Sequence, residues 1–368
     1  MKLTFIGLTL SSSWGNGHAT PYRALLRALA GRGCELSFYE RDVHYYYSRR
    51  DLERCDYARL ELYPTWDEVR EQALREARFS DAVILGSFVP EGERIAAELL
   101  DLGRPLRVFY DLDTPVTLAR LGMGECEYIA AAQLARFDLV LSFTGGGVLE
   151  VLRSVFGARM ARPLYGCVDP DVYVRTAPRA EFAAELAYMG TYAADRQEKL
   201  DALFLEPARR MPQRPFLLAG SLYPWEWGPY WPANVRRLEH VTPAEHPEFY
   251  SSARLALNIT RATMATYGYC PSGRFFEAAA CGAPIVSDRW EGIEEFFRDG
   301  EEIFLAESAE DVAGAMERSD EELARVARRA RERTLAEHTG ERRAEQLLAY
   351  LEEARATKQR PFIQKEAA

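Results

Sequence analysis

The stretch GRFFEAAACGAPIVSD, residues 273–288, places one carboxylate, Glu277, among small and apolar residues. It predicts a helix that begins at Gly273 or Arg274 with Ser272 at the N-cap position. Free N–H groups and a partial positive charge at a helix start favour phosphate, and Arg274 adds a guanidinium. Glu277 follows about one turn later, roughly 5–6 Å along the axis, where a carboxylate can accept hydrogen bonds from both ribose hydroxyls. The spacing indicates a nucleotide site, although a solvated glutamate on an amphipathic helix gives the same pattern.

A second set of carboxylates stands in YDLDTP, where Asp111 and Asp113 end a buried apolar strand. A carboxylate at the end of a central strand faces the ligand edge of an open sheet and can remove the proton from a hydroxyl. Asp113 also precedes Thr114 and Pro115, so capping a helix is an alternative role for it.

The loop WGNGHA joins the first predicted strand to a helix through Gly15, Asn16 and Gly17. The glycines permit a tight turn, but their spacing is not G-x-G-x-x-G, so the dinucleotide-binding fingerprint is not supported. His18 is then either a catalytic base or simply the residue at which the helix starts.

The elements that position these residues alternate between short apolar strands and amphipathic helices. In the first half, strands are predicted at 2–8, 34–40, 81–87, 106–112 and 138–143, and helices at 20–33, 67–78, 91–101 and 126–136. In the second half, strands are predicted at 185–192, 215–221, 236–241, 253–260, 283–288 and 301–306, and a helix at 195–210. Such alternation predicts parallel sheets covered on both faces. The fold class is therefore α/β, with two Rossmann-like domains facing a central cleft.

Domain boundaries follow from a break in periodicity between the two series. We predict an N-terminal domain over 1–165, a linker over 166–184, a C-terminal domain over 185–340 and a last helix over 341–358. The helix at 20–33 is expected to have Thr20 as its N-cap. One face of the last helix is apolar, so it should pack on protein, back across the first domain.

Composition excludes several classes of protein. The formal net charge of −10 argues against a nucleic-acid-binding surface. The 6 cysteines form no C-x-x-C pair and there are only 5 histidines, which argues against a structural metal site and fits reduced thiols in the cytoplasm. No run of about 20 apolar residues is present, so we expect a soluble, cytoplasmic protein without a transmembrane segment.

The segment GRFFEAAACGAPIVSDRWEGIEEFFRDGEEIFLAES resembles the donor-binding signature of glycosyltransferases with the GT-B fold. More narrowly, it resembles the CgeB-like, spore-maturation-type family. Further pieces agree in order, namely SSSWGNGHATPYRALLRALAGRG, FYDLDTP, SFTGGG, VDPDVY, AYMGTYAADRQEKL and HVTPAEHPEFYSSARLALNITR. The resemblance covers nearly the whole chain. The Glu277 segment is specific for nucleotide-sugar transferases, whereas the N-terminal motifs are specific only for the narrower family.

The resemblance implies that the C-terminal domain binds a nucleoside-diphosphate sugar. Glu277 would then bind the ribose, and Ser272, Gly273 and Arg274 would face the diphosphate. Two further residues are expected near the donor phosphates, namely Gly190 and Thr191. Two others are expected beside the base, namely His240 and Val241. Gly190 is alternatively a turn glycine, and His240 an exposed strand end. The loop residues Gly15, Asn16 and Gly17 would lie near the donor sugar and phosphates.

The acceptor would lie in the N-terminal domain, between two loops that follow strands. The predicted acceptor residues are Ser87, Glu91, Tyr45 and Tyr46. The tyrosines stack on a sugar in this interpretation, or simply cover a core. A Trp-rich loop at 221–232 contacts carbohydrate or a partner, or packs at a domain interface.

One position departs from the family pattern. Many retaining GT-B transferases carry a second glutamate eight positions before the ribose glutamate, in contact with the donor sugar. This chain has Tyr269 there, which leaves the identity of the sugar and the stereochemical outcome open.

The sequence therefore predicts a bacterial hexosyl- or deoxyhexosyl-transferase of glycan biosynthesis. It would use a UDP-, GDP- or dTDP-linked sugar and a glycan, protein or small-molecule acceptor. Asp111, Asp113 and His18 are the candidates for catalysis. No cofactor is expected, and the D-x-D spacing of Asp111 and Asp113 is not taken as a metal site, because GT-B enzymes stabilise the leaving diphosphate with helix dipoles and basic groups. Two alternatives remain, a nucleotide-sugar epimerase of the same fold and a non-catalytic subunit of a surface-assembly complex that binds a nucleotide sugar or a glycan.

Overall fold

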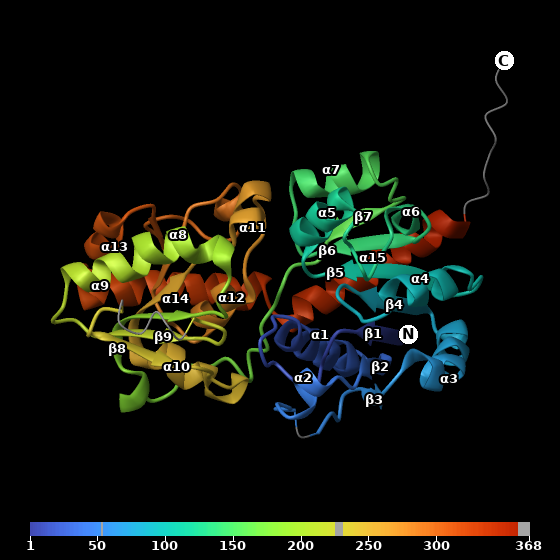
Figure 1. Cartoon of the computed structure of the whole chain (residues 1–368), viewed down its shortest axis with the longest axis horizontal. Coiled ribbons are helices and arrows are strands. Elements are labelled where there is room, and N and C mark those ends of the chain that lie inside the picture. The colour runs from blue at the N-terminus through green and yellow to red at the C-terminus, as the bar shows by residue number, and fades with distance from the viewer. Residues whose placement is uncertain (53, 225–230, 360–368) are drawn as a thin grey trace, which may run out of the picture.

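The chain forms two α/β domains that lie side by side (Figure 1). The computed structural model describes residues 1–52, 54–224 and 231–359. Each domain is built on one parallel sheet, of 7 strands in the first and 6 in the second. This confirms the predicted fold class of two Rossmann-like domains.

The first sheet has the strand order β3-β2-β1-β4-β5-β6-β7, and all of its pairs are parallel. The strands are β1 (Lys2–Gly7), β2 (Glu35–Arg41), β3 (Arg59–Tyr63), β4 (Ala82–Gly86), β5 (Leu106–Asp111), β6 (Leu139–Ser142) and β7 (Ala161–Pro163). The helices are α1 (Ala19–Gly31), α2 (His44–Tyr47), α3 (Trp66–Phe79), α4 (Gly92–Leu100), α5 (Thr114–Met123), α6 (Ala131–Leu134) and α7 (Gly147–Ser154). The order reverses between β1 and β4, and ligands of open α/β sheets bind at such a point.

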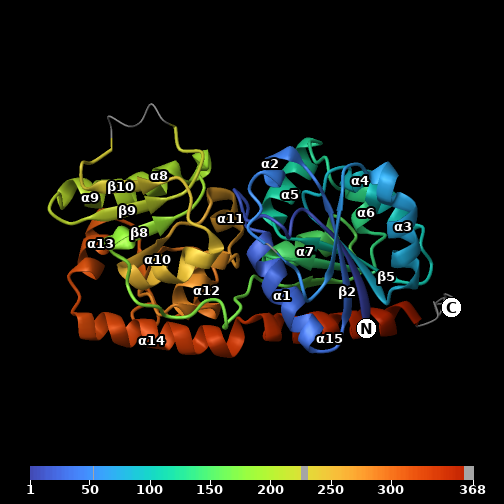
Figure 2. The same cartoon turned by 90° about the horizontal axis from the view of Figure 1, so that it is seen from below.

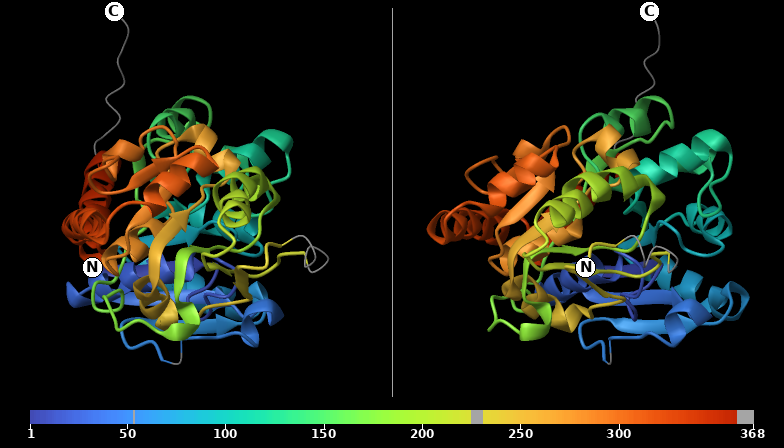
Figure 3. Two further views of the ribbon diagram at one scale, coloured as in Figure 1. Left: turned by 90° about the vertical axis from the view of Figure 1, so that its left-hand side faces the viewer. Right: turned by 60° about the vertical axis from the view of Figure 1, so that its left-hand side comes forward.

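The second sheet has the order β10-β9-β8-β11-β12-β13. Its strands are β8 (Ala184–Met189), β9 (Phe216–Ala219), β10 (Val235–Leu238), β11 (Ala253–Asn258), β12 (Ile285–Asp288) and β13 (Phe304–Ala306). The helices that follow are α8 (Gln197–Leu200), α9 (Glu206–Arg210), α10 (His246–Ser252), α11 (Ala262–Tyr267), α12 (Gly273–Ala280), α13 (Ala309–Met316), α14 (Asp320–Glu337) and α15 (Gly340–Gln359). Figure 3 turns this domain toward the viewer and shows helices on both sides of its sheet.

Apolar side chains fill both faces of each sheet, as the near-continuous apolar strands predict. In the first domain, α1 and α15 cover one face, and α3, α4, α6 and α7 cover the other. In the second domain, α10 and α12 cover one face, and α8, α9 and α13 cover the other.

The predicted strands are confirmed, whereas several helices differ from the prediction. Helix α1 begins at Ala19, so Thr20 lies in its first turn and is not its N-cap. Asn16 supplies the cap instead, because its Oδ1 accepts from the backbone N–H groups of His18 and Ala19. The helix predicted at 195–210 is interrupted by a π-helical turn at Asp201–Leu205. Strands β3 and β7 and helix α7 are short and were not predicted, and the helix predicted at 126–136 is reduced to α6. Helix α5, whose range was not predicted, has Pro115 in its first turn.

Two crossings of the chain join the domains. One runs from β7 to β8, and the other joins α14 beneath the second domain to α15 beneath the first (Figure 2). The crossings pair at Val168 and Thr339, with Gly340 donating its N–H to the Val168 carbonyl. Gly340 packs so closely on the Ala24 carbonyl of α1 that a Cβ would overlap it. Helix α15 is therefore fixed to the first domain at its first residue, while the domain boundaries at 165 and 184 stay predictions.

A buried arginine holds the two crossings together. Arg343 is 2% exposed and donates from Nε to the Tyr165 and Gly166 carbonyls at 3.0 and 3.2 Å. Its Nη1 donates to the Glu337 carbonyl at 3.1 Å, and its Nη2 to Nδ1 of His338 at 2.8 Å. Burial and the Arg343 charge lower the pKa of His338 to about 2, so the neutral imidazole accepts this bond. One guanidinium thus satisfies acceptors from both crossings.

No helix within the described ranges is both long and apolar enough to cross a membrane. The Trp-rich loop predicted at 221–232 lies in part outside the described residues, since 225–230 are not among them.

We predict that Arg343→Met lowers the free energy of unfolding by roughly 2–4 kcal/mol. Methionine fills the volume but leaves the buried carbonyls without donors, and Arg343→Lys should recover part of the loss. Urea unfolding at neutral pH measures the difference. If Arg343→Met were as stable as the parent chain, the crossings would not depend on this guanidinium.

Candidate active site

A histidine and an aspartate form a hydrogen-bonded pair at the switch point of the first sheet. His18 lies at the N-cap position of α1 and Asp113 at that of α5. Nε2 of His18 lies 2.7 Å from Oδ2 of Asp113, and their side chains are 7% and 21% exposed. The Asp113 side chain makes no capping hydrogen bond to α5, so its predicted capping role is not observed. Nδ1 of His18 is buried without a hydrogen-bond partner in the described part of the chain.

Asp111 lies beneath this pair and is 1% exposed. Its Oδ1 accepts from the Asp113 N–H at 3.1 Å and from the Thr117 hydroxyl at 2.8 Å. Burial raises the pKa of Asp111 to about 7, and the negative charge of Asp113 adds to the effect. Asp111 therefore supports the loop from inside, and Asp113 is the carboxylate with solvent-accessible surface.

The glycine loop before His18 is held by two acidic residues that sequence reasoning missed. Glu40 is 1% exposed and accepts from the backbone N–H groups of Leu10 and Ser11 at 2.6 and 2.9 Å. Asp51 accepts from both the N–H and the hydroxyl of Ser13 at 3.0 and 2.6 Å. Their sequence neighbourhoods carry no motif, because only the fold brings 40 and 51 beside this loop.

The predicted acceptor residues differ in burial and in their hydrogen-bond or ion-pair partners. Ser87 is fully buried, and its Oγ accepts from the Leu112 N–H at 3.1 Å, so it supports the Asp111 loop and offers no surface to a ligand. Glu91 has a left-handed backbone, with φ 59°, and pairs with Arg41 at 3.2 Å. Tyr46 is buried, which matches the alternative in which it covers a core.

Tyr45 and Phe88 lie on either side of the His18 loop. Tyr45 is 46% exposed, and its hydroxyl lies against Gly15, where φ is 63° and a Cβ would overlap it. Phe88 also has a left-handed backbone, with φ 59°, and its ring centroid lies 6.2 Å from that of His18. Such a conformation costs about 1–3 kcal/mol for a non-glycine residue and is common at functional sites.

In the second domain, Glu277 is 4% exposed and lies at the domain junction. Its Oε1 accepts from the Thr20 hydroxyl of α1 at 3.2 Å, and its Oε2 lies 3.5 Å from Nδ1 of His246. Burial raises the pKa of Glu277, but hydrogen bonds from His246, Thr20 and Tyr173 outweigh it and leave that pKa below its ordinary value. The carboxylate is thus kept ionised and ready to accept further hydrogen bonds.

Two arginines without a carboxylate partner in the described ranges lie beside the end of β8. Arg274 donates to the Met189 carbonyl, and its guanidinium carbon lies 5.7 Å from the Tyr188 ring centroid. Arg196 donates to the Thr191 carbonyl at 3.0 Å, and its buried Nε has no acceptor among these residues. Burial lowers the pKa of Arg196, and the Arg274 and Arg261 charges lower it further.

The same charges act on the Tyr188 hydroxyl, which is buried without a hydrogen-bond partner in the described structure. Burial raises the pKa of Tyr188, but the charges of Arg196 and Arg274 outweigh it and lower that pKa. Gly190 lets both side chains approach the backbone closely, because a Cβ there would overlap the Arg274 guanidinium and the Tyr188 hydroxyl unless they moved. The end of β8 is thus a strongly positive, partly unsatisfied environment, which is typical of an anion site.

The start of α12 faces the same region. Ser272 occupies the N-cap position, as predicted, but its hydroxyl donates to Oδ1 of Asn258 at 2.7 Å and does not cap the helix. Nothing closer than the Glu277 carboxylate, at 3.9 Å, would meet a Cβ on Gly273. The first N–H groups of α12 are therefore open to a ligand.

His240 and Val241 follow β10 and also approach the first domain. The His240 ring centroid lies 4.5 Å from that of Trp14, and the Val241 carbonyl lies 3.3 Å from Nε2 of His246. Burial lowers the pKa of His240, with His246 adding to the effect. His246 therefore links the predicted base and ribose residues, a role that no sequence motif indicated.

Tyr269 lies between the domains. Its carbonyl accepts from the Gly145 N–H at 3.0 Å, and its N–H donates to the Glu291 carbonyl at 2.7 Å. Its ring fits between Gly146 and Gly292, where a Cβ would overlap it. Within the described residues, no three His, Cys, Asp or Glu side chains gather as a metal site, and metal independence stays a prediction.

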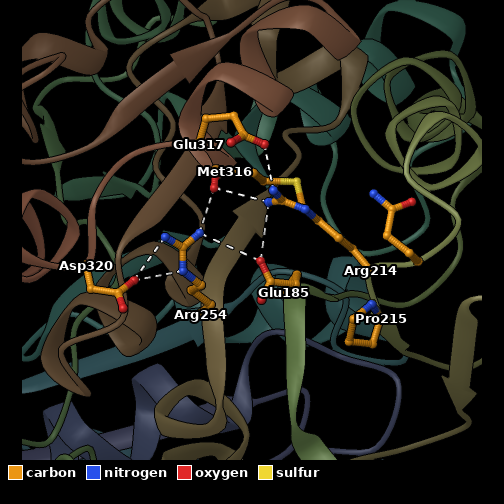
Figure 4. A pocket seen from close by; sticks show the side chains of 8 residues that line it. Glu185, Arg214, Pro215, Arg254, Met316, Glu317 and Asp320 are labelled. Atoms are coloured by element: carbon orange, nitrogen blue, oxygen red, sulfur yellow. Dashed lines mark hydrogen bonds and ion pairs between the residues drawn. The ribbon is translucent and has the colours of Figure 1, made fainter.

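A groove at the opposite edge of the second sheet is lined by charged side chains (Figure 4). Arg254 pairs with Asp320 at 3.0 Å and Arg214 with Glu317 at 2.6 Å. Glu185 lies within 3.7 Å of both arginines. These charges satisfy one another at the start of β8 and β11, so the groove is separate from the candidate site.

We predict that Asp111→Asn changes how stability depends on pH. Between about pH 4 and 7 the unfolded chain has lost the Asp111 proton while the folded chain keeps it, so the parent chain loses stability as pH rises. Asparagine does not ionise, so the variant should gain roughly 4 kcal/mol relative to the parent across this window. Urea unfolding at pH 4 and 8 measures this, with the surface variant Asp171→Asn as control. A constant difference between variant and parent would show that Asp111 is ionised in the folded protein.

Comparisons with known proteins agree with the two-domain fold. Residues 196–349 match the family model described as "Glycosyl transferase-like". Sucrose-phosphate synthase from Thermosynechococcus elongatus superposes with a TM-score of 0.70 at 15% identity, over 97% of this chain and 99% of that one. Anabaena HepE in complex with UDP and glucose gives 0.68 at 15% identity, over 96% and 99%. An alpha-glucosyltransferase in complex with UDP-glucose and DNA containing an abasic site gives 0.75 at 13% identity, over 95% and 99%.

A search of curated proteins gives no significant match. At these identities the solved structures establish the fold alone. The chain therefore has the GT-B fold, and residues 196–349, which include α14 and the first half of α15, match the glycosyl transferase-like family.

Proposed function

We propose that this protein transfers a sugar from a nucleoside-diphosphate sugar to an acceptor hydroxyl. The observation that carries the proposal is the pair Arg196 and Arg274. Both guanidiniums lie at the end of β8 without a carboxylate partner in the described residues, and Arg196 has a buried, unsatisfied Nε. Both arginines are half-buried and keep N–H donors that the described residues do not use, so this arrangement favours a bound anion. A diphosphate satisfies both arginines and the open N–H groups of α12 together.

Glu277 supports a nucleoside next to that anion. The carboxylate lies one turn into α12, so it is about 5–6 Å beyond the helix start. It is ionised, and it already has Thr20, His246 and Tyr173 as donors. A carboxylate has about four acceptor sites, so capacity remains for a ribose hydroxyl.

The pair His18 and Asp113 supports deprotonation of the acceptor. Nε2 of His18 is bound to Asp113, so the proton of an attacking hydroxyl can pass to Nδ1 while the Asp113 carboxylate stabilises the imidazolium. As the acceptor oxygen bonds to the anomeric carbon, the bond to the diphosphate breaks. The negative charge that develops on the diphosphate faces Arg196, Arg274 and the α12 dipole.

The finer assignments extend the same proposal. The chain is a CgeB-like, metal-independent, cytoplasmic hexosyl- or deoxyhexosyl-transferase, and its donor is linked to UDP, GDP or dTDP. HepE and the alpha-glucosyltransferase are described with UDP-glucose or UDP and glucose, so UDP-glucose is the first donor to test.

The deciding experiment is thermal unfolding of the intact protein with UDP-, GDP-, dTDP- and ADP-linked sugars, followed by product analysis. Donor at 100 times its Kd stabilises the folded state by about 2.7 kcal/mol. Epimerised donor in the absence of acceptor would replace the transferase proposal with the epimerase alternative. Binding without turnover across an acceptor panel would favour the non-catalytic alternative, and no shift with any nucleotide sugar would refute the donor site.

We predict that Arg196→Met abolishes the shift in melting temperature caused by the nucleotide sugar. In the absence of ligand the variant should be as stable as the parent or more stable, because an unpaired buried charge is removed. This opposite response separates a binding role from a structural one. Arg159→Met, which removes an exposed arginine of the first domain, is the control and should retain the ligand-induced shift. A retained shift in Arg196→Met would show that the diphosphate lies elsewhere.

We predict that His18→Ala and Asp113→Asn each lower kcat by about 10²–10⁴, the usual contribution of a positioned acid or base. Donor affinity should change less than about twofold, because neither side chain contacts the arginine cluster. Steady-state kinetics and donor titration measure the two quantities, with Asp171→Asn as control. A parent-like kcat in both variants would place the base on another residue.

A further inference from the structure

One short segment of the first domain contacts both His240 and Glu277 of the second domain, the residues proposed to lie at the base and at the ribose. It runs from Trp14 to Thr20 and contains His18. At one end, the Trp14 ring lies 4.5 Å from the His240 ring, and at the other the Thr20 hydroxyl donates to Oε1 of Glu277 at 3.2 Å. The start of α1 and helix α12 thus meet at the junction between the domains (Figure 1).

Trp14 contacts a cation of its own domain and a ring of the other domain. The Arg49 guanidinium carbon lies 3.8 Å from the indole centroid, and the His240 ring centroid lies 4.5 Å away at an interplanar angle of 53°. No carboxylate pairs with Arg49 in the described structure, so its charge is free to stabilise the indole contact. The contact holds the chain at His240 and Val241, whose next helix carries His246.

Thr20 orients the ribose residue. The Glu277 carboxylate accepts from Thr20 of the first domain, and His246 and Tyr173 contact it as well. These contacts fix the plane of the carboxylate without using all of its lone pairs. The side chain proposed to bind the ribose is therefore positioned in part by the opposite domain.

The segment is rigid on its own side. Glu40 and Asp51 hold the backbone at Leu10, Ser11 and Ser13, and Asn16 ties the loop to α1. A movement of the segment relative to Glu277 therefore requires movement of the first domain as a body.

We propose that Trp14 and Thr20 complete the donor site from the N-terminal domain and are positioning residues for the donor nucleoside. This inference rests on the proposed function. Its consequence is a physical link between the bound donor and the proposed catalytic base His18, because Trp14 and Thr20 lie before and after His18 in the same segment. Binding of the donor then favours the closed arrangement in which His18 reaches the anomeric centre.

The test is donor affinity measured by calorimetry without acceptor, on the intact protein, with UDP-glucose or whichever nucleotide sugar stabilises the parent. We expect Thr20→Val and Trp14→Ala to weaken donor binding roughly tenfold, the loss of one hydrogen bond to a charged group or of one packed aromatic contact. Thr20→Ser and Trp14→Phe keep the hydroxyl and the ring and should bind nearly as the parent does. Thr357→Val on α15 and Phe79→Ala at the end of α3 are the matched controls outside the site.

The possible outcomes distinguish a failure of this inference from a failure of the proposed function. Parent-like affinity in Thr20→Val and Trp14→Ala, with a parent that binds donor, overturns this inference and leaves the proposed function standing. Equal weakening in Thr20→Val and Thr20→Ser also overturns it, because the hydroxyl then has no role. A parent that binds no nucleotide sugar refutes the proposed function and the inference with it.

Discussion

The second domain holds, at the end of β8, two positive charges that the described residues do not neutralise. Arg196 and Arg274 lie together there, and within the described ranges each guanidinium donates to a backbone carbonyl and pairs with no carboxylate. Repulsion between such charges in a partly buried site costs stability, which a fold tolerates when a ligand supplies the opposite charge. Gly190 and the open start of α12 fit the same constraint, because both leave room beside the guanidiniums.

A two-domain site of this kind requires that the domains keep a defined relation. Two crossings join them, and the Arg343 guanidinium ties both to the start of α15. Helix α15 packs along α1, and the first turn of α1 carries Thr20. The two crossings are therefore connected to Thr20 through these two helices. The position of Thr20 against Glu277 is thus determined by packing far from the site as well as by the local hydrogen bond.

Periodicity in the sequence predicted both sheets, and helix-start signals correctly predicted that Glu277 lies in a helix that begins at Gly273. Other features depend on contacts between distant segments and had no local signal. His246 contacts Glu277 although about 30 residues separate them in the sequence. Glu40 likewise supports a loop about 30 residues before it. Asp111 and Asp113 look equivalent in the sequence, yet Asp111 is the buried last residue of β5 while Asp113 lies beyond the strand, at the start of α5, and is partly exposed.

Tyr269 shows how packing decides the residue type at a position where the family resemblance leads one to expect a glutamate. Its backbone has φ 48°, and its ring fills the space between two glycines, Gly146 and Gly292, that themselves have φ 57° and 82°. A carboxylate in this space would be desolvated between backbones that offer it no positive charge. An aromatic ring instead gains contact area from both domains. The chain uses this position to join the domains, so in the proposed function the groups that bind the donor sugar come from other elements.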